Sequence, residues 1–197
     1  MNNSTKIALG VSLIAIGITI AFRRKSSNGT ATLINNSNSN SQYNMSTNTA
    51  LPRGYRNNNP LNLEISKEQW KGKLSPNTDG RFEQFVSLPY GYRANLINMR
   101  TSITKHGCDT IGKLINRWAP PGENNVASYI NRVCNYMGEL GASVNANTKL
   151  SANDKEMLCK MAYAMSRVEN EAPQYMAAIR NAGLPNMEII YKGWELI

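Results

Sequence analysis

The sequence predicts a mainly helical domain that contains one short extended or β element and is preceded by one transmembrane helix. Three observations support this fold class. Residues 7–22 are apolar and uncharged, a polar segment without acidic residues follows them, and most of the remaining chain places apolar residues at helical spacing. A chain of 197 residues has room for one domain and additional segments.

Residues 7–22 are expected to form a membrane anchor after a short tail, residues 1–6. Arg23, Arg24 and Lys25 follow the apolar segment at once. This flank opposes export and leaves no cleavage site of small residues, so a retained span is favoured over a signal peptide. By the positive-inside rule, the globular part begins on the cytoplasmic side.

The basic flank and a linker rich in Ser and Asn occupy residues 23–50, and a globular domain is predicted over residues 51–197. All 13 acidic residues and most of the 22 Lys and Arg lie in that domain, and the whole chain carries a net charge of +9. A basic domain is attracted to a lipid membrane, a bacterial wall or nucleic acid. Nucleic acid is the disfavoured partner, because the domain has no dense basic run and no recognised nucleic-acid motif.

Metal, cofactor and thiol chemistry are not expected. Cys108, Cys134 and Cys159 have no CxxC spacing and lie among apolar helical positions, which is typical of small buried residues. A single histidine, His106, argues against a zinc site or a histidine triad. Any chemistry is therefore expected to use carboxylates.

An extended element is predicted at residues 61–66, where leucine and isoleucine alternate with polar residues. The following segment, residues 70–85, contains Gly, Pro and Asp-Gly, which indicates a loop or hairpin. Helical spacing then begins at Gly91. A second helix is expected after Asp109 or Thr110, and a third should end at Gly138.

The fourth predicted helix contains the leading catalytic candidate, Glu169. Ser151 and Asp154 resemble a capping box at its start, and Pro173 should end it near Asn170. Glu169 lies on the apolar stripe of the last turn, where burial and the helix dipole both favour the neutral acid. Such an acid suits glycoside cleavage, although a structural ion pair explains the position equally well.

Glu123 is the second candidate, because it follows a Trp-Ala-Pro-Pro corner and precedes a helix. A helix N-terminus favours acidic residues through its dipole alone, so the structural explanation is stronger there. Glu64 and Asp79 are expected to be solvated or turn-forming.

Carbohydrate is the ligand class that the asparagine-rich stretch at residues 55–66 indicates. Its amides suit an uncharged polar ligand, and aromatic rings elsewhere in the chain could stack on sugars. Each ring alone is better explained as core. The expected sugar-binding residues are Asn58, Asn59, Pro60, Asn62, Phe85, Trp118 and Tyr129.

Ordered motifs in the domain resemble a family of small phage and prophage virion proteins, labelled structural proteins, whose core reads R-N-N-N-P-G-N-I. The motifs are "RGYRNNNPLNLEI", "WKG", "FEQFVSLPYGYRA", "TIGKLINRWAPPGENNVASYINRV" and "AMSRVENEAPQY". The resemblance covers roughly residues 53–197. It implies other virion proteins as partners and a place in the virion membrane, after insertion into the host cytoplasmic membrane.

The asparagine-rich stretch also resembles bacterial wall glucosaminidases and lytic transglycosylases. In those enzymes a helix that ends in a catalytic Glu precedes the stretch, whereas residues 1–52 contain no Glu. The segment "LCKMAYAMSRVENE" is similar to that helix, which implies a lysozyme-like, circularly permuted α+β domain with Glu169 as the acid. Leu61 and Glu171 stand where the resembling patterns have Gly.

The resemblance implies a membrane-anchored virion protein that cleaves the glycan strands of peptidoglycan. Glu169 would protonate the glycosidic oxygen, with substrate assistance or with water attack through Glu123 or Glu64. The alternative is a non-catalytic virion structural protein that binds glycan or links membrane and capsid. A basic nucleic-acid-binding membrane protein ranks behind both.

Overall fold

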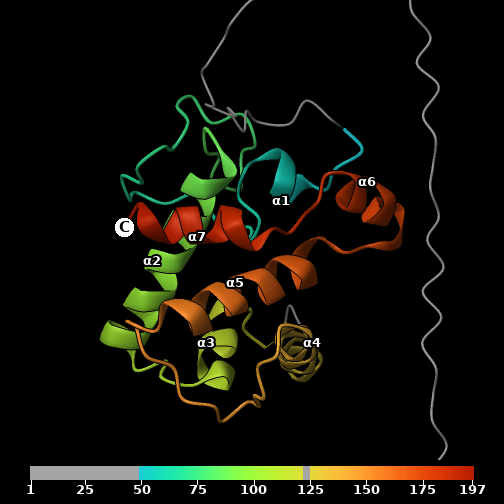
Figure 1. Cartoon of the computed structure of the whole chain (residues 1–197). Helices are drawn as coiled ribbons and strands as arrows, with labels where there is room; N and C mark the ends of the chain where they lie inside the picture. Colours follow the sequence, from blue (N-terminus) through green and yellow to red (C-terminus); the bar gives the residue numbers. More distant parts are fainter. Residues whose placement is uncertain (1–48, 122–124) are drawn as a thin grey trace, which may run out of the picture. The chain divides into compact units, whose positions relative to one another are not determined.

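A computed structural model describes residues 49–121 and 125–197 (Figure 1). The predicted tail and anchor, nearly all of the predicted linker, and Glu123 lie outside these ranges. Among the described residues, no helix combines the length and apolar character that a membrane crossing requires.

The described residues are mainly helical, as predicted. In chain order the elements are α1 (Arg53–Arg56), α2 (Leu88–His106), α3 (Ile111–Trp118), α4 (Val126–Glu139), α5 (Lys155–Asn170), a short 3-10 helix η1 (Pro173–Tyr175), α6 (Met176–Asn181) and α7 (Met187–Glu195). The four predicted helices correspond to α2, α3, α4 and α5.

Helix α5 lies at the centre of the domain and packs against α1, α2, α4 and α7. Figure 1 shows α5 between α7 and α4. Leu158, Met161, Ala162 and Met165 are fully buried on its inner face. A helix with so wide an apolar face is held by packing on several sides, which fixes the direction in which its last turn points.

The helix starts agree only partly with the predicted caps. Thr110 caps α3 as expected, because its side chain accepts a hydrogen bond from the Lys113 amide. Helix α5 is capped by Asp154, whose side chain accepts from the Met157 amide, and not by Ser151. Asp154 directly precedes the helix, so its carboxylate can accept from the free amides of the first turn. Its negative charge also interacts favourably with the helix dipole.

The predicted β element is not a strand, so the α+β part of the expected fold class is corrected. Within the described residues only isolated antiparallel bridges occur, and two of them, Glu64 with Phe82 and Lys73 with Phe85, lie in this region. The loop or hairpin predicted at residues 70–85 returns along the chain through Phe82 and Phe85 in these bridges. Gly72 and Gly80 both have positive φ, and these turns interrupt the pairing before a continuous ladder can form.

Candidate functional site

The asparagine turn, residues 57–62, is mostly occupied by the chain itself. Asn58 donates from Nδ2 to the Phe85 carbonyl at 2.9 Å. Asn59 donates from Nδ2 to the Leu63 and Glu83 carbonyls at 2.9 and 3.0 Å, and its Oδ1 accepts from the Leu63 amide at 3.0 Å. These amides satisfy backbone groups that a continuous strand would otherwise have paired.

Burial removes several predicted sugar-binding residues from reach. Asn58 is 2% exposed, and Asn59 and Phe85 are 0% exposed. Pro60 is buried as well. Little surface of these four side chains is open to a sugar in this structure, and their binding role stays a prediction. Leu61, at the place of the family's Gly, is a fully buried core residue.

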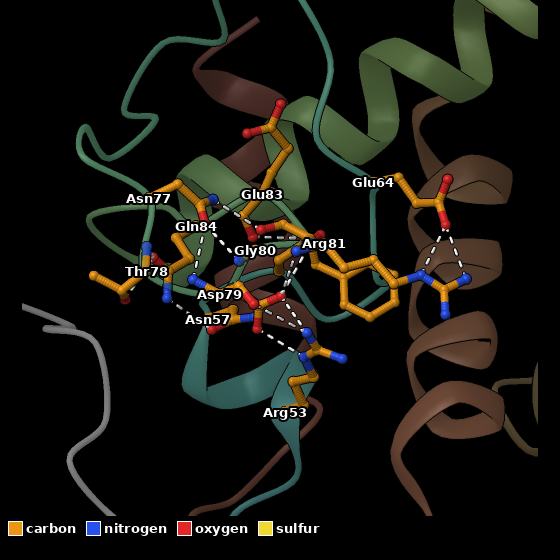
Figure 2. Close-up of polar contacts among 12 residues, drawn as sticks. Arg53, Asn57, Glu64, Asn77, Thr78, Asp79, Gly80, Arg81, Glu83 and Gln84 are labelled. Carbon is orange, nitrogen blue, oxygen red and sulfur yellow. Dashed lines mark hydrogen bonds and ion pairs between the residues drawn. The ribbon is translucent and has the colours of Figure 1, made fainter.

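A charged cluster anchors the other end of the turn to the loop at residues 77–84 (Figure 2). Asp79 Oδ2 accepts from Asn57 Nδ2 at 2.7 Å and from Arg53 Nε at 2.7 Å. Burial acts to raise the pKa of Asp79, but the hydrogen bonds from Arg53 and Asn57 outweigh it and hold that pKa well below its usual range. Figure 2 also shows Glu64 paired with Arg81, an exposed contact as expected.

Glu169 lies where the asparagine turn, α4 and α5 meet. Its Oε2 accepts from Asn62 Nδ2 at 2.9 Å, and its Oε1 accepts from the Tyr129 hydroxyl at 2.7 Å. The side chain is half-buried. The premise of an isolated carboxylate is therefore corrected: Glu169 is held by two donors. The structure does bring together three of the predicted site residues, Glu169, Asn62 and Tyr129.

The Tyr129 hydroxyl is a firm proton donor to Glu169. Desolvation by burial, and then the negative charge and hydrogen bond of Glu169, raise the pKa of Tyr129 well above 10. Tyr129 is 7% exposed and packs in the core through its ring. It therefore remains protonated throughout the range in which proteins work, with its hydroxyl at the edge of the pocket.

Glu169 borders a pocket of about 280 Å³. The pocket is lined by Asn125, Ser128, Tyr129, Arg132, Val168 and Glu169. Asn125 is the N-cap of α4, and the three α4 residues of this set are spaced so that they share one face of the helix. The sequence-based prediction missed Arg132, although its position three residues after Tyr129 was the available signal. Trp118 is half-buried, packs against the core and does not line this pocket.

Asn170 connects the end of α5 to the asparagine turn, and it was also not predicted. Its Nδ2 donates to the Pro60 carbonyl at 2.7 Å and to the Ser166 carbonyl at 2.8 Å. The contact needs a glycine in α1, because a Cβ on Gly54 would lie 2.5 Å from Asn170 Oδ1. Asn170 thus fixes the turn that carries Asn62 beside the helix end that carries Glu169.

Further carboxylates of the described residues are already engaged. Glu171 pairs with Arg167 and accepts from the Tyr136 hydroxyl at 3.0 Å. Glu83 is 0% exposed and pairs with Lys73 at 2.8 Å. In the part of the chain that the structure describes, no three His, Cys, Asp or Glu side chains are grouped as metal ligands. Cys108 and Cys159 are buried and free.

The comparisons with known proteins point to a phage. No family model matches the chain. The chain is 38% identical over 126 residues to protein P5 of Pseudoalteromonas phage PM2, a match that covers 62% of this chain and 74% of P5. This relationship supports the expectation of a phage protein, whereas a likeness to lysozyme-like enzymes is not shown. The chain belongs to the family of phage proteins that includes protein P5 of phage PM2.

Proposed function

We propose that the chain is a phage virion protein whose folded domain cleaves the glycan strands of peptidoglycan, with Glu169 as the general acid. One observation carries this proposal. The Glu169 carboxyl group borders an open pocket and is oriented by Asn62 and Tyr129, which come from two other parts of the fold. The relationship to P5 supplies the phage context.

The two partners of Glu169 suit an acid that must hold and release a proton. A tyrosine hydroxyl both donates and accepts, so Tyr129 can stay hydrogen-bonded to Glu169 whether the carboxyl group is ionised or protonated. Asn62 donates from Nδ2 to the second oxygen. Because both oxygens have partners, the orientation of the carboxyl group is set before substrate arrives, which lowers the cost of reaching the transition state.

In the proposed reaction, the proton moves from Glu169 to the glycosidic oxygen as the bond from that oxygen to the sugar C1 breaks. The leaving sugar departs as an alcohol. Glu171 and Glu83 are engaged elsewhere and do not line the pocket, so the N-acetyl group of the substrate is the proposed internal nucleophile. The N-acetyl oxygen bonds to C1 as the leaving group departs. Water or a hydroxyl of the same sugar then attacks C1, the bond from C1 to the N-acetyl oxygen breaks, and the proton of the attacking hydroxyl returns to the Glu169 carboxylate.

The anchor and the partners belong to the same proposal. The uncharged segment 7–22 and its basic flank would hold the protein in the host cytoplasmic membrane and afterwards in the virion membrane, next to other virion proteins. The polar linker would let the domain reach the wall at the next infection. Delivery in a virion would explain how a domain that is first placed on the cytoplasmic side of the membrane reaches a substrate outside the cell.

Glu169→Gln in the full-length protein tests the acid. Purified peptidoglycan should lose turbidity with the wild type, and the variant should be about 10²–10⁴-fold slower. The control Glu188→Gln removes the same charge from an exposed position on α7 and should clear walls at the wild-type rate. Product masses separate the outcomes, since hydrolysis adds one water per cleaved bond and capture by a hydroxyl of the same sugar adds none. Equal clearing by wild type and Glu169→Gln would exclude Glu169 as the acid.

The second candidate function is a non-catalytic virion structural protein. It is favoured by the burial of Asn58, Asn59 and Phe85, which leaves fewer sugar contacts around the pocket than the sequence predicts. If the wild-type protein clears walls under no condition of pH and salt, yet remains folded and associated with virions, this second function replaces the first.

A further inference from the structure

Arg132 is a cation without an ionic partner at the edge of the pocket. It is half-buried and forms no ion pair with any described residue. Arg167 is a useful comparison, because both guanidinium groups lie over the ring of Tyr136. The distance to the ring centroid is 5.9 Å for Arg132 and 3.9 Å for Arg167. Arg167 pairs with both Glu139 and Glu171. Among the described residues, no carboxylate forms such an ion pair with Arg132.

The surroundings of Arg132 favour one kind of ligand group. A guanidinium is a planar fork that binds a carboxylate through two parallel hydrogen bonds, and the Tyr136 ring supports its plane. Arg132 is the one cation among the residues that line the pocket, and Glu169 lines it too. A singly charged carboxylate can be matched by one guanidinium, whereas a doubly charged phosphate would remain partly unneutralised beside Glu169.

We infer that Arg132 binds a carboxylate carried on the lactyl arm of N-acetylmuramic acid, next to the bond that Glu169 cleaves. This inference rests on the proposed function, since it takes the substrate to be peptidoglycan. The carboxylate belongs either to the lactyl group itself or to the peptide attached to it. The pocket would thereby distinguish muramic acid from plain N-acetylglucosamine, which carries no carboxylate.

Kinetics of Arg132→Gln on three substrates test the inference. The substrates are intact peptidoglycan, strands stripped of peptide by an amidase, and uncharged chito-oligosaccharides. KM should rise about tenfold where the carboxylate is present, with little change in kcat, and should not change on chito-oligosaccharides. A rise on intact strands alone assigns the carboxylate to the peptide, and a rise on stripped strands alone assigns it to the lactyl group, whose carboxyl is an uncharged amide until the amidase removes the peptide.

Two variants control for charge and for folding. Arg180→Gln removes a positive charge from an exposed site on α6 that does not line the pocket, and it should leave KM unchanged. Arg132→Lys keeps the charge but loses the fork, so its KM should lie between those of the wild type and Arg132→Gln. An equal KM for Arg132→Gln and wild type on every substrate would overturn the inference while leaving the acid role of Glu169 in place.

Binding without turnover separates the two proposals. Full-length Glu169→Gln protein, titrated separately with N-acetylmuramic acid, which carries the free lactyl carboxylate, and with muramyl dipeptide, which carries a peptide carboxylate, should show saturable chemical-shift changes in its arginine side-chain signals with at least one of the two. The same titration of the Glu169→Gln/Arg132→Gln protein should show about tenfold weaker binding. If the wild type cleaves no wall but this difference is found, the binding site stands and the catalytic proposal fails. Equal binding by both proteins would refute the site.

Discussion

The asparagine turn and the Glu169 pocket are built from the same kinds of side chain but differ in how many polar atoms remain available. In the turn, Asn58 and Asn59 give their side-chain amides to backbone carbonyls, and Asp79 is held by Arg53 and Asn57. In the pocket, Arg132 has no ionic partner among the described residues, and Glu169 lies beside open space.

This difference teaches that a cluster of polar residues is not evidence of a binding site until its hydrogen bonds are counted. A buried amide whose donors and acceptors are all paired stabilises the fold, and it has nothing left to offer a ligand. Substitutions in the turn should therefore lower stability, and substitutions in the pocket should lower activity. Three predictions test the first half of this contrast, in order of decreasing effect.

Gly91→Ala should cause the largest loss of stability. Gly91 lies in α2, and a Cβ there would be 1.7 Å from the carbonyl oxygen of Asn58, which is backbone and cannot simply rotate away. We expect the free energy of unfolding to fall by about 3 kcal/mol, the upper part of the range for overpacking. Denaturant unfolding followed by circular dichroism measures the change.

Gly138→Ala is the matched control for Gly91→Ala. Gly138 also lies in a helix, α4, but nothing is found within 4 Å of a Cβ built on it. Alanine should be neutral there or stabilise the protein by up to about 1 kcal/mol through its higher helix propensity. Equal losses from both substitutions would show that close approach of the turn to α2 is not what Gly91 permits.

Asn59→Ala should lower the free energy of unfolding by about 2 kcal/mol, because it leaves the Leu63 amide and the Glu83 carbonyl buried without this partner. Asn62→Gly is the comparison variant. It removes the contact to Glu169 without straining the backbone, since φ of Asn62 is 54°. Asn62→Gly should lower the rate of wall clearing clearly and the free energy of unfolding only slightly. The reverse pattern would place the functional residue in the buried part of the turn.

Acid should weaken the asparagine turn through Asp79, with the smallest effect of the three. The pKa of Asp79 is lower in the folded protein than in the unfolded chain. The stabilisation is therefore complete above the unfolded pKa near 4 and is lost as pH falls below it. We expect a loss of about 1 kcal/mol between pH 5 and pH 2, because Arg53 is partly exposed and solvent screens the pair.

The acid effect is measured as a difference between proteins. Thermal unfolding of Asp79→Asn should depend less on pH below 4 than that of the wild type. Glu188→Gln is the control, since Glu188 is exposed on α7 and lies outside the turn. A pH dependence in Asp79→Asn equal to that of the wild type would show that Asp79 does not anchor the turn.

The helical spacing of apolar residues predicted the long helices, because the side chains at that spacing lie on one face and pack against the core. Helices α2 to α5 all have wide buried faces, and their approximate ends were predictable from Gly and Pro. The short helices α1, α6 and α7 were missed, although Asn186 caps α7 and was a visible signal. The alternation at residues 61–66 misled the strand prediction, because only Leu63 and Ile65 form backbone hydrogen bonds with the returning segment, and Asn59 takes the Leu63 amide.

The site was predictable where a residue broke the pattern of its own helix. Glu169 stands out on an apolar stripe, and its proximity to Asn62 could be proposed only through a resemblance. Arg132 and Asn170 were missed, because their roles depend on partners from distant segments that spacing along one helix does not reveal. The burial of Asn58 and Asn59 was likewise invisible, since a paired amide and a free amide look the same in a sequence.

The contact between Asn62 and Glu169 spans 107 residues of chain, and that between Tyr129 and Glu169 spans 40. Closing so long a loop costs conformational entropy before the contact can repay it, so the pocket belongs to the late stages of folding. A ribosome must release most of the domain before Glu169 can meet either partner. The carboxyl group therefore acquires its two donors only after the asparagine turn and α4 have both packed against α5.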